Sequence, residues 1–395
     1  MDIYHDLMSI TRWFYGKKQI FHLILTIMSV FLFLTMIAPP ILSTNTNIQN
    51  NKFKIIEVIT NTLQKPTQID MLLFLSPQYQ NDSEILFSIN NYIATVKQDV
   101  NWTVKIIPIL NKQNQYNTID KIIEQHYYND TIKACLMVGE DLDTASSGQY
   151  MNMEKPSIMP WATLGGNKSY ETKNQHIISK TYTIDIFISL LYPNQYLSYE
   201  TKKTQIINTF NTFSNQRKHT DKSSISILES RSKDTQSTDF YKTMFNQSTV
   251  QHMENPSKIK LAISTQKTHT MYFVRGHSNP SETILNEQEN TRFTSKHLKS
   301  LNTPLFAADG CYVNGYWINQ NNTNQKSSYG NIVCENQNIH IMILGLISQK
   351  EKSTQQTQNT INDILSGKTI TSTFLNSTTM GDLVFYGDPT FHYSS

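Results

Sequence analysis

Cysteine and charge are both scarce in this chain. It has only three cysteines in 395 residues, so a dense disulfide framework is excluded and at least one thiol is unpaired within the chain. Charged residues make up 16% of the sequence, below the ~25% of an average globular protein. The formal net charge is +3 and no long basic run interleaved with aromatic residues occurs. We therefore expect no nucleic-acid partner.

A long apolar run, in contrast, is present near the N-terminus. Residues Ile20 to Ala38 contain no charged side chain and are about as long as a helix that crosses a bilayer. Arg12, Lys17 and Lys18 precede this run, and positive residues favour the cytoplasmic side. A buried core helix would need a polar face, which the run lacks. The sequence therefore predicts one transmembrane helix.

The order of segments follows from this prediction. We expect a cytoplasmic tail at residues 1–18, a transmembrane anchor or signal segment at 19–42 and a linker at 43–66, with the rest of the chain facing outside. The alternative is a cleaved signal peptide, which would make the protein secreted. An anchor is favoured because the apolar region is long and APPILSTN offers no clear small-x-small cleavage site.

Strands and helices alternate after the linker, which predicts an α/β fold with parallel sheets flanked by helices. A first subdomain is expected at residues 67–220. Its elements are a strand at 69–76, a helix at 83–97 capped by Ser83, a strand at 102–110 in which Pro108 marks an end or an edge, a helix at 118–128 and a strand at 132–139. Residues 151–169 contain proline and glycine breakers and predict a long loop. A strand at 183–193 and a helix at 199–218 follow.

The second subdomain, expected at residues 221–395, holds the residues that can carry chemistry. One predicted strand ends in a Gly-His turn at His277, and the next ends in Gly-Cys at Cys311. A helix at 292–302, with Ser295 as its cap, is predicted between them. Strand, helix and strand form a parallel crossover unit, so both carboxyl ends lie at one edge of the sheet. His277 and Cys311 are therefore predicted to lie side by side.

A cysteine beside a histidine suits nucleophilic catalysis. The thiolate attacks a carbonyl carbon, and the imidazole acts as general acid and base. Backbone N–H groups of Ser278 and Cys311 are the candidate oxyanion donors. The structural alternative is that Cys311 is inert packing at a strand end. The remaining cysteines, Cys135 and Cys334, could form a disulfide, or Cys135 could be a small buried hydrophobe in its apolar run.

The motifs around these residues resemble the gingipain family of cysteine peptidases, whose catalytic domain has a caspase-like fold. The matching residues are Gly276 and His277, then Cys311, Val313, Asn314 and Gly315, then Tyr386, Gly387, Asp388 and Pro389. The resemblance covers roughly residues 67 to 395. Two departures are Ser278, where the family has glycine, and Tyr312, which is inserted after the cysteine. PWATLGG also lacks the acidic residues that would suggest cleavage after a basic residue.

The resemblance implies a cysteine endopeptidase that acts on protein or peptide substrates through a Cys311–His277 dyad, and the apolar run at residues 20–38 implies that it is membrane-anchored. This chemistry needs no cofactor. The resemblance allows a structural calcium ion, but no ligand cluster in the sequence identifies one. The alternative, from a different class, is a catalytically inactive surface module that keeps the fold for binding.

Overall fold

The structure is a computed structural model. It describes residues 68–109, 115–142, 145–150, 153–164, 170–173, 176–179, 182–217, 219, 224–230, 250–310, 312–317, 327–345, 362–379 and 383–394. The chain divides into units at residues 1–66 and 67–395, and all described residues belong to the second. None of the helices in these ranges is both long and apolar enough to cross a membrane. The segment predicted to do so, residues 19–42, lies outside the described residues.

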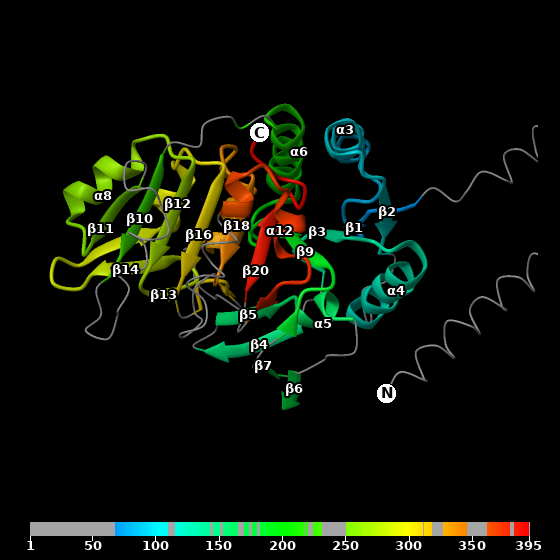
Figure 1. Cartoon of the computed structure of the whole chain (residues 1–395), viewed down its shortest axis with the longest axis horizontal. Helices are drawn as coiled ribbons and strands as arrows, with labels where there is room; N and C mark the ends of the chain where they lie inside the picture. The colour runs from blue at the N-terminus through cyan, green and yellow to red at the C-terminus, as the bar shows by residue number, and fades with distance from the viewer. Residues whose placement is uncertain are drawn as a thin grey trace, which may run out of the picture. The chain divides into compact units, whose positions relative to one another are not determined.

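One ten-stranded sheet forms the centre of the fold (Figure 1). In spatial order its strands are β11 (Val250–Glu254), β10 (Ile225–Glu229), β12 (Met271–Arg275), β16 (Leu305–Asp309), β18 (Ile341–Leu344), β20 (Val384–Gly387), β9 (Phe187–Leu191), β3 (Ala134–Val138), β1 (Met71–Leu75) and β2 (Val104–Pro108). Pro108 ends the edge strand β2, as predicted. The sheet contains strands from before and after residue 220. The subdomain boundary that was predicted at this residue stays a prediction.

The sheet consists of two parallel halves that run in opposite directions. All neighbouring strands pair in parallel except β18 and β20, which pair antiparallel with Ile341 opposite Gly387. β20 then pairs in parallel with β9 of the first half. Consequently the carboxyl ends of β12 and β16 lie at the edge opposite to the carboxyl ends of β1 and β3. The predicted parallel sheet with flanking helices is confirmed, and the reversal between its halves is new.

Two long helices pack together beside the first half of the sheet (Figure 1). Helix α3 (Ser83–Val100) buries Ile85, Ile89, Tyr92 and Val96 at helical spacing, as predicted. Its cap, however, is Asp82 and not Ser83, because the Asp82 carboxylate accepts from the backbone N–H groups of Glu84 and Ile85. The Tyr92 ring in α3 lies 5.3 Å from the ring of Phe210 in α6 (Tyr199–Asn215). Helix α4 (Gln115–Asp130) is the third helix of this half.

Two segments differ from the predictions. Residues 151–169 were expected to be a loop, but they contain β5 (Met153–Ser157) and α5 (Met159–Ala162). The predicted breaker Pro156 is the partner of Ser146 in an antiparallel pair, so pairing with a neighbouring strand overrides the local signal. This pair belongs to a five-stranded sheet of β17 (Tyr316–Trp317), β5, β4 (Ala145–Tyr150), β7 (His176–Ser179) and β6 (Tyr170–Lys173), while β8 (Tyr182–Thr183) pairs with β19 (Thr378–Thr379).

The connection between β12 and β16 is also richer than a single helix. It holds the antiparallel strands β13 (His277–Asn279), β14 (Glu282–Asn286) and β15 (Thr291–Thr294), followed by the short helix α9 (Ser295–Lys299). Thr294 precedes this helix as its cap, so the assignment of Ser295 was one residue late. The remaining helices in the described part of the chain are α8 (Lys258–Thr265), α10 (Tyr329–Ile332) and α12 (Ile370–Phe374).

A buried polar cluster fixes the chain beyond β20. The Asp388 carboxylate accepts from Tyr92 Oη at 2.7 Å and ion-pairs with the Arg217 guanidinium at 2.9 Å. It also accepts from the backbone N–H of Thr390 at 2.8 Å. Asp388 is 2% exposed, and its charge is therefore compensated by these partners instead of by water. The closing motif thus ties the C-terminus to α3 and α6.

Two neighbouring histidines, the buried His340 and the half-buried His219, lie next to this cluster. The rings of His219 and His340 are 4.5 Å apart, and both contact the ring of Phe391. Burial lowers the pKa of His340 to about 3, with a smaller contribution from His219 in the same direction. Burial also lowers the pKa of His219. Both imidazoles are therefore neutral in the folded protein at neutral pH.

These histidines predict a loss of stability in acid. The folded pKa of His340, about 3, lies below the ordinary value of 6.5, so the unfolded chain takes up the proton first as the pH falls. The stabilisation is full above the unfolded pKa and declines below it. From pH 7.5 to pH 5 this group should reduce the free energy of unfolding by about 2 kcal/mol. Urea titrations at both pH values should show a smaller reduction in His340→Phe, and an unchanged reduction would contradict the prediction.

Candidate active site

The candidate site begins with the paired ends of β12 and β16. These strands are parallel, with Arg275 opposite Asp309 in the register. The backbone N–H of Gly276 continues the pairing by donating to the Asp309 carbonyl at 3.2 Å. His277 and residue 311 each follow two positions after this pair along the chain. The predicted parallel arrangement of the two strands is therefore present.

Two glycines let these strand ends approach closely. A Cβ atom on Gly310 would lie 2.2 Å from the Gly276 carbonyl oxygen and 2.2 Å from Ser278 Oγ. A Cβ atom on Gly276 would lie 2.2 Å from the Ile284 carbonyl oxygen. Contacts this short exclude any side chain at either position. Glycine is thus required on both sides, which explains why Gly precedes both His277 and Cys311.

Ser278 braces the turn that carries His277. Its hydroxyl donates to the Gly276 carbonyl at 2.9 Å and bonds the Thr283 hydroxyl at 2.9 Å. Ser278 belongs to β13 and is not among the non-glycine residues with positive φ in the described part of the chain. Serine in place of the family's glycine therefore introduces no left-handed strain here.

The His277 side chain is exposed. Its backbone pairs with Ile284 of β14, so the hairpin holds the residue at the sheet edge while its imidazole faces solvent. Cys311 itself lies outside the described residues, as does any geometry of the predicted dyad. The neighbours Gly310 and Tyr312 are described.

The chain turns sharply after position 311. The Val313 N–H donates to the Gly310 carbonyl at 3.4 Å, and the Gly315 N–H donates to the Tyr312 carbonyl at 2.9 Å. Tyr312 has a φ of 54°, a left-handed conformation that is unfavourable for a bulky residue. Such backbone strain costs about 1–3 kcal/mol and is concentrated at functional sites. The inserted residue is therefore the strained residue of the turn.

The residues after this turn enter the core. Val313 is 0% exposed and Asn314 is 1% exposed. The Tyr386 hydroxyl in β20 donates to the Asn314 carbonyl at 3.4 Å. The Val-Asn-Gly motif and the C-terminal motif, 72 positions apart in the sequence, are thus brought together.

A row of charged residues that was not predicted from the sequence lies at this edge. Glu254, Glu229, Arg275 and Asp309 end four adjacent strands and lie in register with one another. Arg275 Nε lies 3.5 Å from Asp309 Oδ2, an ion pair two residues before the predicted dyad. Glu229, Arg275 and Asp309 each end a mostly apolar run, whereas Glu254 ends the mixed run VQHME. The apolar runs were the signal available, but strand register could not be read from them.

The other two cysteines do not form the disulfide that was considered. Cys135 and Cys334 are both free and buried. Burial raises the pKa of both thiols. At Cys334 the negative charge of the neighbouring Glu335 carboxylate raises the pKa as well. Cys135 is therefore a small buried hydrophobe of β3, the other of the two alternatives.

Known structures share this fold. The crystal structure of the Arg-specific cysteine proteinase gingipain R (RgpB) matches with a TM-score of 0.53 at 13% identity, covering 84% of this chain and 79% of the other. A complex of Porphyromonas gingivalis RgpB pro- and mature domains matches with a TM-score of 0.51 at 15% identity, covering 82% and 79%. No protein-family model and no curated protein matches the sequence. The chain therefore has a gingipain-like fold.

The three thiols are predicted to differ in reactivity. Iodoacetamide should label Cys311 first in the folded full chain, because the thiolate is the nucleophile and the other two thiols are buried with raised pKa values. Peptide mapping by mass spectrometry after short exposure gives the order of labelling. Cys135 and Cys334 should become equally reactive only in denaturant. Preferential labelling of either of them in the folded protein would contradict the assignment.

Proposed function

We propose that the chain is a cysteine endopeptidase in which Cys311 is the nucleophile and His277 the general acid and base. The observation that supports this most directly is the parallel pairing of β12 and β16, since it brings the backbone before each residue to one sheet edge. The gingipain-like fold supports the same chemistry. The substrates are peptide bonds in proteins or peptides.

The reaction would proceed in two steps. The Cys311 thiolate forms a bond to the scissile carbonyl carbon, and the negative charge moves to the carbonyl oxygen. His277 donates a proton to the leaving amine as the C–N bond breaks, which leaves an acyl-enzyme. Water then attacks the acyl group, with His277 accepting its proton and the thiolate leaving. Backbone N–H groups of Ser278 and Cys311 are the proposed oxyanion donors, each worth about 3–4 kcal/mol.

A binding module without activity is the second candidate. The positive φ of Tyr312 favours it, because this inserted residue directly follows the proposed nucleophile. In that case the fold would be retained for recognition, and the Gly276–Ser278 turn would serve only to support the sheet edge.

Digestion of a peptide library separates these candidates. The full chain should cleave some peptides or itself, and Cys311→Ala should reduce the rate by several orders of magnitude. Cys135→Ala is the matched control, because it removes a buried thiol of β3 instead of the proposed nucleophile. The folded variant should keep the activity of the wild type. His277→Ala should resemble Cys311→Ala.

Ser278→Gly is the informative third variant. Its loss of two hydroxyl bonds should change the rate only modestly if Ser278 contributes through its backbone N–H. Activity in Ser278→Gly but not in the wild type would instead indicate that Ser278 prevents the backbone N–H at this position from stabilising the oxyanion. That outcome would favour the inactive binding module. If no sample cleaves any peptide or itself, even after an activating cleavage has been tested, the proposed peptidase activity is refuted.

We further propose that residues 19–42 anchor the protein in a membrane, with residue 43 onward outside. Protease added to sealed vesicles should then degrade residues 67–395 wherever the extracytoplasmic face is accessible. Protection of that region in right-side-out vesicles would contradict the topology. A mature N-terminus near residue 43 would instead identify a cleaved signal peptide.

A further inference from the structure

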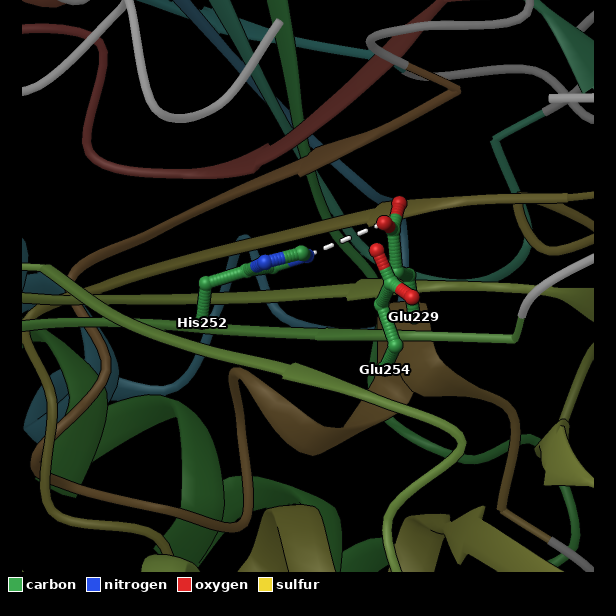
Figure 2. A group of neighbouring side chains, drawn as sticks. All are labelled: Glu229, His252 and Glu254. Carbon is green, nitrogen blue, oxygen red and sulfur yellow. Dashed lines mark hydrogen bonds and ion pairs between the residues drawn. The ribbon is translucent and has the colours of Figure 1, made fainter. Parts of the chain in front are cut away.

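Three potential metal ligands converge at the ends of β10 and β11. Glu229 is the last residue of β10, and Glu254 lies opposite it at the end of β11. His252 precedes Glu254 by two positions, which places both side chains on one face of the strand. Figure 2 shows the imidazole pointing toward the two carboxylates. His252 Nε2 lies 2.9 Å from Glu229 Oε1, and one donor atom from each residue lies within 4.8 Å of the others.

The charges at this position favour a bound cation. Two carboxylates directly opposite each other on neighbouring strands repel. Glu229 is 2% exposed, so water does little to screen its charge. Arg275 is its partner in the register on β12, but it also ion-pairs with Asp309. The row of strand ends therefore carries three carboxylates and one guanidinium.

We propose that Glu229, His252 and Glu254 bind one divalent transition-metal ion of the Zn²⁺ or Mn²⁺ class. Zinc bonds to imidazole nitrogen and carboxylate oxygen are about 2.0–2.2 Å long, and in a tetrahedral site two such donors lie about 3.4 Å apart. The His252–Glu229 distance of 2.9 Å is a hydrogen-bond length. The two donor atoms would therefore move apart by about 0.5 Å to hold the ion. A metal ion can bond all three donors at once, whereas an imidazolium N–H makes one directed bond. Nitrogen in the donor set disfavours Ca²⁺ and Mg²⁺, which prefer oxygen.

The bound ion would act as a clamp on the edge of the sheet. Among the strands of the described residues, β11 is the outermost of this half, and β10 is its neighbour in the large sheet. His252 follows Glu229 by 23 positions, so shared ligation closes a long connection between the strands. A link that closes such a loop in the native state stabilises the fold. His252 and Glu254 are partly exposed, which leaves a path for the ion and for water ligands.

Zinc binding by the full chain, purified in detergent and stripped with a chelator, tests this proposal. Titration with ZnCl₂ against a chromogenic chelator should give one ion per chain and an increase in melting temperature. His252→Gln and Glu254→Gln should each weaken binding by at least about tenfold, since even residues that merely orient metal ligands contribute that much. Both variants leave the buried Glu229 unchanged, and the amide that His252→Gln introduces can still donate a hydrogen bond to its carboxylate.

His126→Gln is the matched control, because His126 Nδ1 also pairs with a carboxylate, Asp130, but within α4 and away from the Glu229–His252–Glu254 group. This variant should bind zinc like the wild type. Absence of zinc binding would overturn the proposal and identify the group as a proton-mediated ion pair. Equal binding in the wild type, His252→Gln and Glu254→Gln would overturn it by placing the ion elsewhere. A melting-temperature increase with CaCl₂ but not with ZnCl₂ or MnCl₂ would contradict the metal class.

Discussion

The pairing of β20 with both β18 and β9 is the constraint on which the rest of the fold depends. β20 comes from the C-terminal end of the chain, yet it lies in the middle of the ten-stranded sheet. Gly387 ends it with a φ of 117°, and a Cβ atom there would lie 2.1 Å from the His340 carbonyl oxygen, so only glycine fits. Asp388 then binds Tyr92 and Arg217 of the first half. The two halves of the sheet are therefore joined through β20 and the residues that follow it.

The reversal at this pairing gives the two sheet edges different chemistry. In the first half, the polar groups after β1 and β3 satisfy one another: the Tyr79 hydroxyl donates to Glu140 at 2.9 Å, and Lys202 ion-pairs with Glu140 at 2.5 Å. In the second half, the strand ends carry Glu229, Asp309 and the exposed His277. Because β12 and β16 run in the same direction, the potentially reactive groups gather at one edge.

Local patterns predicted the elements better than their arrangement. The helical spacing of Ile85, Ile89 and Tyr92 identified α3, and the apolar run after the linker identified β1, because burial imposes these periods. The cap was misplaced since Asp82 and Ser83 both suit that role and only geometry separates them. Nothing in VFYG indicates an antiparallel partner, and nothing in VQHME indicates that Glu254 faces Glu229. Direction and register are set by tertiary pairing, which one sequence does not encode locally.

The same strand that joins the halves also supports the candidate site. Tyr386 in β20 holds the Asn314 carbonyl through its hydroxyl, and its ring packs so closely on Gly330 that a Cβ atom there would lie 2.4 Å away. The turn after Cys311 is therefore attached at one end to β16 through Gly310 and at the other to β20 through Asn314. The left-handed backbone of Tyr312 lies between these attachments. Asn314 is buried, and Gly310 approaches the Gly276 carbonyl oxygen closely, so the chain is held on both sides of Tyr312. A change that shifts β20 would consequently reach the turn at Tyr312 without touching His277.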